Sequence, residues 1–203
     1  MGLVYIEYFS RRPGVGLEEF RAAAAQGQEG WDAAYGEDQL VLSLGRTWRL
    51  GPEPEYLAVW YSPKAGLERL DAWDRIFRSG AADRMEQPFF RVARIDAAGC
   101  YEPLVEPMRR RDGTYYAEFF CARGDREAIR AFYLERASRH PGFTLALLVL
   151  RLGKLGPDPG GLAVWAIPDF ASLEQIAREP EGVQQPVELV MAGTYAEFGR
   201  EIL

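Results

Sequence analysis

Residues 50–60, LGPEPEYLAVW, return as residues 155–165, LGPDPGGLAVW, with three differences, and this repetition decides the fold. Two other blocks recur in the same order: YIEYF at 5–9 as YAEFF at 116–120, and EEFRA at 18–22 as EAIRA at 127–131. Chance similarity between short apolar strands is the alternative, but it does not explain a shared order. A repeat of this length predicts that one structural unit has been duplicated.

Each half of the chain predicts the element order strand, helix, strand, strand, helix, strand. In the first half, alternation and helical spacing predict elements over 3–9, 17–35, 39–50 and 56–61, a helix opened at Ser62-Pro63, and a strand over 89–95. In the second half they predict elements over 114–121, 125–139, 143–155, 161–167, 170–178 and 187–198. We therefore expect one repeat over 1–98, a linker over 99–112 and a second repeat over 113–203.

The β-α-β-β-α-β order is the ferredoxin-like arrangement, in which both helices cover one face of an antiparallel sheet. The other face is not polar here, because Tyr5 and Phe9 alternate with Val4, Ile6 and Tyr8 on the first strand. Each sheet then needs a partner sheet. We predict an α+β protein of two tandem ferredoxin-like βαββαβ repeats, whose antiparallel sheets pack as a pseudo-dimer within one chain or between two.

Composition excludes several classes of protein. The chain has 203 residues and a formal net charge of −6, which gives no electrostatic reason to bind nucleic acid. Two cysteines and one histidine make no structural zinc motif, and we expect no metal. The N-terminal apolar run is broken by Glu7 and has no basic leader, so we expect no signal, no membrane span and a cytoplasmic location.

Two glutamates in equivalent strands are the candidate catalytic residues. Glu7 and Glu118 lie between aromatic residues in YIEYF and YAEFF. A carboxylate desolvated among aromatic rings has a raised pKa and can act as a general base, or can bind a polar ligand. The structural alternative is that Arg46 and Arg151, on the second strands, neutralise the two glutamates as ion pairs.

The same alternation predicts a ligand-binding surface. If the aliphatic Leu57 and Val59 face the helices, then Trp60 points into the space between the sheets, as does its counterpart in the second half. The predicted ligand-binding residues are Tyr5, Phe9, Arg46, Trp60, Tyr116, Phe120, Arg151 and Trp165.

His140 is the one histidine of the chain and directly precedes Pro141-Gly142. Proline ends a helix, and an imidazolium at that end complements the helix dipole, so the sequence predicts that His140 caps the third helix. With a single histidine and no Gly-x-Ser-x-Gly elbow, a hydrolytic triad is a poor explanation.

The element order and the strand YLAVW at 56–60 resemble the dimeric α+β barrel superfamily, with a NIPSNAP-like flavour. The resemblance implies a barrel that binds or acts on a small hydrophobic or aromatic ligand, as a monooxygenase-like enzyme that needs no cofactor does. The alternative is a non-enzymatic protein with a filled core, whose role is assembly or partner binding. Edge strands of such sheets stay available, so we also expect a homo-oligomer. Chlorite dismutase-like proteins also have tandem units and hold haem through a histidine of the second unit, which makes His140 a third candidate, as a haem ligand.

Overall fold

The structure is a computed structural model that describes residues 2–34, 38–47, 55–80, 88–108, 113–179 and 185–197. The first repeat contains β1 (Leu3–Arg11), α1 (Leu17–Ala34), β2 (Gln39–Arg46), β3 (Tyr56–Ser62), α2 (Glu68–Arg78) and β4 (Ala93–Pro103). The second contains β5 (Thr114–Ala122), α4 (Arg126–Arg139), β6 (Thr144–Arg151), β7 (Gly161–Ile167), α5 (Leu173–Ala177) and β8 (Val187–Glu197). The duplicated element order is therefore confirmed.

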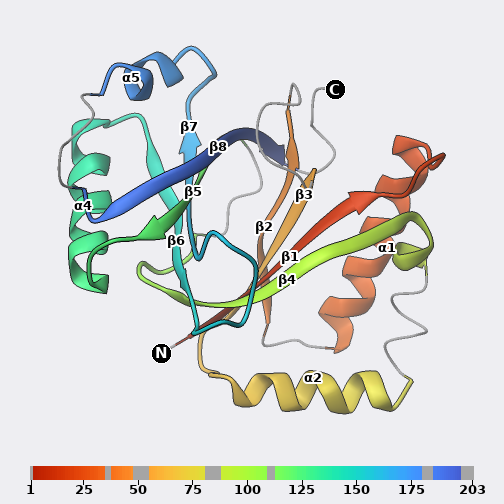
Figure 1. Ribbon diagram of the computed structural model, residues 1–203. Helices are drawn as coiled ribbons and strands as arrows, with labels where there is room; N and C mark the ends of the chain where they lie inside the picture. The colour runs from red at the N-terminus through yellow and green to blue at the C-terminus, as the bar shows by residue number, and fades with distance from the viewer. Residues whose placement is uncertain are drawn as a thin grey trace.

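All eight strands form one closed antiparallel barrel in the order β1-β3-β2-β8-β5-β7-β6-β4. Each repeat contributes four neighbouring strands, and short seams join the two sets, β2 to β8 and β4 to β6. Figure 1 shows α4 and α5 on one side of the barrel and α1 and α2 on the other. The two sheets thus pair within a single chain, and the helices of each repeat cover the outside of its own strands.

The strand register repeats the sequence duplication. Glu7 lies opposite Ala58 in the β1–β3 pair, and Glu118 lies opposite Ala163 in the β5–β7 pair. Each unit also carries a register shift one or two residues after its glutamate, at Tyr8/Phe9 and at Phe119/Phe120. The two glutamates therefore occupy equivalent places.

Aliphatic side chains fill the inside of the barrel, contrary to the predicted orientation. Val4, Ile6, Leu57 and Val59 are all within 1% of complete burial and pack against the matching residues of the second repeat, including Val164. An eight-stranded barrel has an interior just wide enough for side chains to fill, and β-branched and small residues fit it best. The expectation that Leu57 and Val59 face the helices is wrong.

The tryptophans pack beneath the helices instead of between the sheets. Trp60 joins Phe9 and Phe20 in a cluster under the first pair of helices, and Trp165 joins Tyr133 in the corresponding cluster of the second repeat. The barrel interior holds Phe119 and four tyrosines beside its aliphatic residues, Tyr8, Tyr101, Tyr115 and Tyr195, whereas both tryptophans pack in the space between the strands and the helices. Any site built around Glu7 or Glu118 consequently lies on the outside of the barrel.

Two predicted boundaries also differ from the structure. Residues 88–92 are helical, so the strand expected over 89–95 begins at Ala93 and runs on to Pro103. The strand therefore takes up the first five positions of the linker expected over 99–112. Residues 51–54, between two of the predicted strands, and residues 109–112, at the end of that linker, lie outside the described residues.

Gly161 gives a test of the packing in the second repeat. A Cβ atom at this position would overlap the ring of Phe120, which is completely buried. We expect Gly161→Ala to lower the free energy of unfolding by roughly 1–3 kcal/mol, as overpacking of a core does. Urea denaturation measures the change. In the control Gly160→Ala, the added carbon meets its nearest neighbour at 3.5 Å, an ordinary contact, so a loss as large as that of Gly161→Ala would contradict the prediction.

Candidate functional site

Glu118 lies at the bottom of a polar network under the helices of the second repeat. Its side chain is 1% exposed, and both carboxylate oxygens accept hydrogen bonds from Nη1 of Arg136 at 2.7 Å. Trp165 donates a third hydrogen bond from Nε1 at 3.2 Å, and the Arg136 guanidinium lies 5.6 Å from the centre of the same indole ring. A buried charge needs such compensation, and Glu118 has it.

The network continues from Arg136 toward the end of α5. Arg136 donates from Nε to Glu179 at 2.6 Å, and the other oxygen of Glu179 contacts Nε2 of His140 at 2.7 Å. His140 also stacks on Phe143, with ring centres 5.3 Å apart. The result is a chain of alternating polar groups, Glu118, Arg136, Glu179 and His140, that links β5, α4 and the end of α5.

Helix α4 positions two of these groups by its own geometry. Ile129, Tyr133 and Arg136 are its buried residues, and their spacing of four and three places them on one stripe of the helix. Asp125 caps the start by accepting a hydrogen bond from the amide of Ala128, and His140 is the C-cap, its amide donating to Ala137. The predicted place of His140 at the end of this helix is confirmed, and its effect on the helix dipole stays a prediction.

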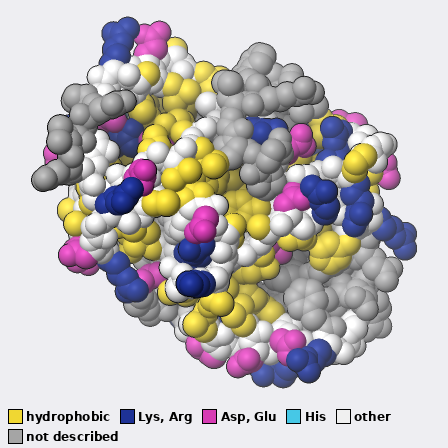
Figure 2. Space-filling view, viewed as in Figure 1, with side chains coloured by type: hydrophobic (Ala, Val, Ile, Leu, Met, Phe, Trp, Pro, Cys, Tyr) yellow, Lys and Arg dark blue, Asp and Glu magenta, His cyan; other side chains and the backbone are white. Residues whose placement is uncertain are grey.

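A cleft of about 430 Å³ opens above this network, and we call it the second-repeat cleft. Its walls are aromatic and aliphatic, and its polar residues come from the network: Tyr116, Glu118, Phe132, Tyr133, Arg136, Ile176, Ala177, Glu179, Gln185, Val187 and Leu189. Figure 2 shows hydrophobic side chains gathered where β8 crosses this face, and Leu189 there is 51% exposed. Burial, together with the charge of Glu118, raises the pKa of Tyr116 and Tyr133 above the ordinary value, so both phenols stay protonated.

Among the residues that the structure describes, none gives Glu7 a cation like the one that pairs with Glu118. The one described partner of Glu7 is Trp60, which donates from Nε1 at 3.1 Å. The match of residues 18–22 with 127–131 places Gly27 where the second repeat has Arg136. Desolvation raises the pKa of Glu7 to about 7, against the weaker opposing effect of the Trp60 hydrogen bond. The duplicated carboxylates are thus chemically different.

The structure separates the predicted arginine partners from the glutamates. Arg46 pairs with Glu55 at 3.9 Å, and Arg151 pairs with Asp158 at 2.8 Å. Neither bonds to Glu7 or Glu118 in the described part of the chain. The expectation that Arg46 and Arg151 neutralise the glutamates is therefore wrong, because Arg136 reaches Glu118 from the helix side, where the carboxylate points.

The predicted aromatic residues lie on the same side as the glutamates, but most of them fill core. Tyr5 packs on Trp73 with ring centres 5.0 Å apart, and Phe9 stacks on Tyr56 at 5.5 Å. Phe120 is completely buried against Tyr133. Of the predicted ligand-binding set, Tyr116 lines the second-repeat cleft, as does the predicted catalytic Glu118. The binding and catalytic roles of these residues stay predictions.

Arg136 and Glu179 are the site residues that sequence reasoning missed. A comparison of the two halves carries the signal for Arg136, because it is a charged residue on the apolar stripe of α4 and stands where the other half has glycine. Glu179 follows a helix of five residues, and no spacing or repeat in the sequence marks it as a partner of Arg136. Only the folded chain brings it to Arg136.

The described residues hold no group of three or more His, Cys, Asp or Glu side chains placed to bind a metal ion directly. Among the helices that the structure describes, none has the length and apolar character needed to span a membrane. The polar network and the second-repeat cleft are the features of this site.

Comparison with known proteins identifies the fold. No family model and no curated protein matches the sequence. Among solved structures, a mutant chlorite dismutase from Candidatus Nitrospira defluvii in complex with cyanide is similar with a TM-score of 0.60 and 10% identity, over 97% of this chain and 91% of that one. A haem-binding protein from Thermus thermophilus is similar with a TM-score of 0.57 and 13% identity, over 96% of this chain and 90% of that one.

These structures support the ferredoxin-like α+β barrel and correct the functional expectation. They are named as chlorite dismutases and a haem-binding protein, which does not support a cofactor-independent monooxygenase. The alternative, a non-enzymatic protein with a filled core, is not supported either. It includes no haem, whereas one of the similar structures is named as a haem-binding protein. The expected ferredoxin-like α+β barrel fold is confirmed, whereas a NIPSNAP-like flavour is not shown.

The second-repeat cleft has the kinds of residues that a haem requires. Its aromatic and aliphatic walls suit a flat macrocycle, and Arg136 is a cation at its base. His140 is not a lining residue, but its Nε2 atom is held by the lining residue Glu179. Histidine is a common axial ligand of haem iron, so the donor set fits the group.

Replacement by glutamine should change the stability of the protein in opposite directions at the two glutamates. The pKa of Glu7 is raised in the folded chain, from 4.5 to about 7, so the folded state binds more protons and stability falls as pH rises through that window. Glu7→Gln should remove this loss and stabilise the protein at pH 8 by roughly 1–3 kcal/mol. Urea denaturation at pH 5 and pH 8 measures it. The matched variant Glu118→Gln breaks the pair with Arg136 and should destabilise by roughly 3 kcal/mol. Equal signs for both variants at pH 8 would refute the assignment.

Proposed function

We propose that this chain is a haem-binding protein whose haem occupies the second-repeat cleft. The observation that carries the proposal is the Glu179–His140 hydrogen bond beside a cleft with apolar walls. The similarity in fold to a haem-binding protein and to chlorite dismutases supports it. A bound haem supplies an iron centre that takes an axial protein ligand and carries out redox or ligand-binding chemistry.

The walls of the cleft would exclude water from the macrocycle. Phe132 and Tyr133 come from α4, Ile176 from α5, and Val187 and Leu189 from β8, so the apolar surface is drawn from three elements. A volume of about 430 Å³ lies within the range of pockets that bury a medium-sized organic ligand. Arg136, already held by Glu118 and Glu179, would meet a carboxylate of the ligand as a fixed cation.

His140 is the residue proposed to hold the iron. Metal-binding histidines are oriented by a hydrogen bond from the ring to a carboxylate or a carbonyl oxygen. Here Nε2 contacts Glu179 at 2.7 Å, and Nδ1 lies 3.4 Å from the side-chain oxygen of Gln175. Because Glu179 holds Nε2, Nδ1 is the nitrogen that would ligate the iron, in place of its longer contact with Gln175.

Titration of the purified protein with haemin tests the proposal. We expect the wild type to give a shifted and sharpened Soret band that saturates at one haem per chain. His140→Ala should lose the spectrum of a histidine-ligated haem, because no other histidine exists in the chain. Added imidazole should restore that spectrum by replacing the missing side chain.

The control for this experiment is Gln175→Ala, which removes the neighbour of Nδ1 and leaves the imidazole in place. It should bind haemin as the wild type does. A wild type that gives no Soret shift would refute the haem proposal. A normal wild-type spectrum that is unchanged in His140→Ala would keep haem binding and refute the ligand assignment.

Blocking the cleft gives a second prediction. Ala177 lines the cleft and is exposed, so tryptophan at this position fills the cleft without entering the core. We expect Ala177→Trp to weaken haemin binding at least about tenfold, as measured by the same titration. The matched variant Ala171→Trp places the same bulk on an exposed residue outside the lining. Equal affinities of the two variants would place the haem elsewhere.

A further inference from the structure

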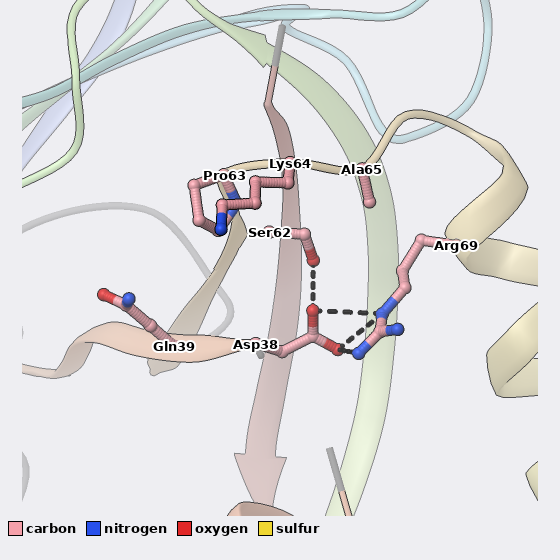
Figure 3. Close-up of a pocket in the computed structure, with 7 residues that line it drawn as sticks. All are labelled: Asp38, Gln39, Ser62, Pro63, Lys64, Ala65 and Arg69. Carbon is pink, nitrogen blue, oxygen red and sulfur yellow. Dashed lines mark hydrogen bonds and ion pairs between the residues drawn. The ribbon is translucent and has the colours of Figure 1, made fainter. Parts of the chain in front are cut away.

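A smaller pocket lies in the first repeat, where the start of β2, the end of β3 and the residues before α2 meet. Its volume is about 290 Å³ (Figure 3). Two cations, Lys64 and Arg69, line it together with the carboxylate of Asp38 and the polar side chains of Ser62 and Gln39. It shares no lining residue with the second-repeat cleft.

Asp38 is a completely buried carboxylate whose acceptor capacity is already used. Ser62 donates its hydroxyl to Oδ1, and Trp73 donates from Nε1 to Oδ2 at 3.0 Å. Arg69 donates from Nε to both oxygens, at 3.1 and 3.0 Å, and its Nη2 lies 3.0 Å from Oδ2. Because four donor groups surround it, Asp38 has no need of a cationic ligand, and its effect is to fix the guanidinium of Arg69.

Arg69 and Lys64 keep donors for a ligand. Arg69 uses its Nε and Nη2 edge on Asp38, and its Nη1 has no partner among the residues that the structure describes. Lys64 is exposed and likewise has no ion-pair partner within that part of the chain. Two cations and one carboxylate leave the pocket with one excess positive charge, so its electrostatics favour an anion.

The second repeat shows that the fold does not require this cluster. The register of the β2–β3 and β6–β7 pairs places Phe143 where the first repeat has Asp38. The same offset puts Ile167, Asp169 and Glu174 at the positions of Ser62, Lys64 and Arg69. The second repeat therefore forms the same strands and the same helix position with none of these polar groups, and with acidic residues in place of both cations.

We propose that the first-repeat pocket binds a compact oxyanion, the carboxylate or phosphate group of a small organic molecule, between Lys64 and the free edge of Arg69. A guanidinium held in one orientation presents its remaining N–H groups in the fixed geometry that carboxylate and phosphate oxygens match. Figure 3 shows the Lys64 side chain extending toward Pro63, and its flexible stem would have to turn to bring the ammonium to the anion. The pocket has room for the anionic group and a few further atoms, with Pro63 and Ala65 as its apolar lining.

Calorimetric titration with inorganic phosphate and with acetate, at constant ionic strength, tests this site. We expect at least one of the two anions to bind the wild type, and Lys64→Ala to weaken that binding about tenfold, as the loss of one charge-assisted hydrogen bond does. Binding of phosphate alone assigns a phosphate ligand, and binding of acetate alone assigns a carboxylate ligand.

The matched control is Lys154→Ala, because Lys64 and Lys154 are the two lysines of the chain and both are exposed. It should bind the anion as the wild type does, whereas Lys64→Glu should abolish binding. Lys64 and Lys154 make no described hydrogen bond, so all three variants, Lys64→Ala, Lys64→Glu and Lys154→Ala, should fold. Failure of both anions to bind the wild type would overturn the proposal, and so would equal weakening by Lys64→Ala and Lys154→Ala. Haemin titration of Lys64→Ala, expected to match the wild type, keeps this result separate from the haem proposal.

Discussion

Closure of the eight-stranded barrel is the constraint on which the rest of the structure depends. Two sets of four strands meet at short seams, and the space that they enclose is filled by aliphatic side chains such as Val4, Ile6 and Val59. Tyrosines such as Tyr8 and Tyr101 share this core, but a charged side chain there would be desolvated. The glutamates of the repeated strands point outward, under the helices, together with the tryptophans that donate hydrogen bonds to them. The candidate chemistry lies between barrel and helices for this reason.

Burial of a carboxylate under the helices needs compensation, and the two repeats solve this differently. In the second repeat Arg136 binds both oxygens of Glu118 and extends the ion pair to Glu179. In the first repeat the equivalent helix position is Gly27, and the pKa of Glu7 is raised by desolvation. The same strand position thus carries a carboxylate paired with an arginine in one repeat, and in the other a carboxylate whose pKa is raised to about 7 by desolvation.

The sequence predicts the architecture better than the orientation of the strands. The repeated blocks establish the element order, and alternation establishes that Glu7 and Trp60 share a face, as their hydrogen bond confirms. Alternation cannot show which face of a strand lies inside the barrel when both faces are apolar. The face predicted to point inward therefore points outward in the structure. Pro141 after His140 marks a helix end by local chemistry alone. Arg136 stands out only when the two halves are compared, and Glu179 and Asp38 acquire their partners through tertiary packing that no local pattern reveals.

Duplication makes each repeat a control for the other. Where both halves carry the same residue, as at Trp60 and Trp165, the shared fold is a sufficient explanation. Where the halves keep one backbone but differ in charge, the fold does not demand either residue. The Arg136 network and the Asp38–Arg69 pair are both of this second kind, and each belongs to one repeat only. A structural requirement of the shared fold would have appeared in both repeats, and this difference between the repeats is the reason for proposing a separate ligand for each site.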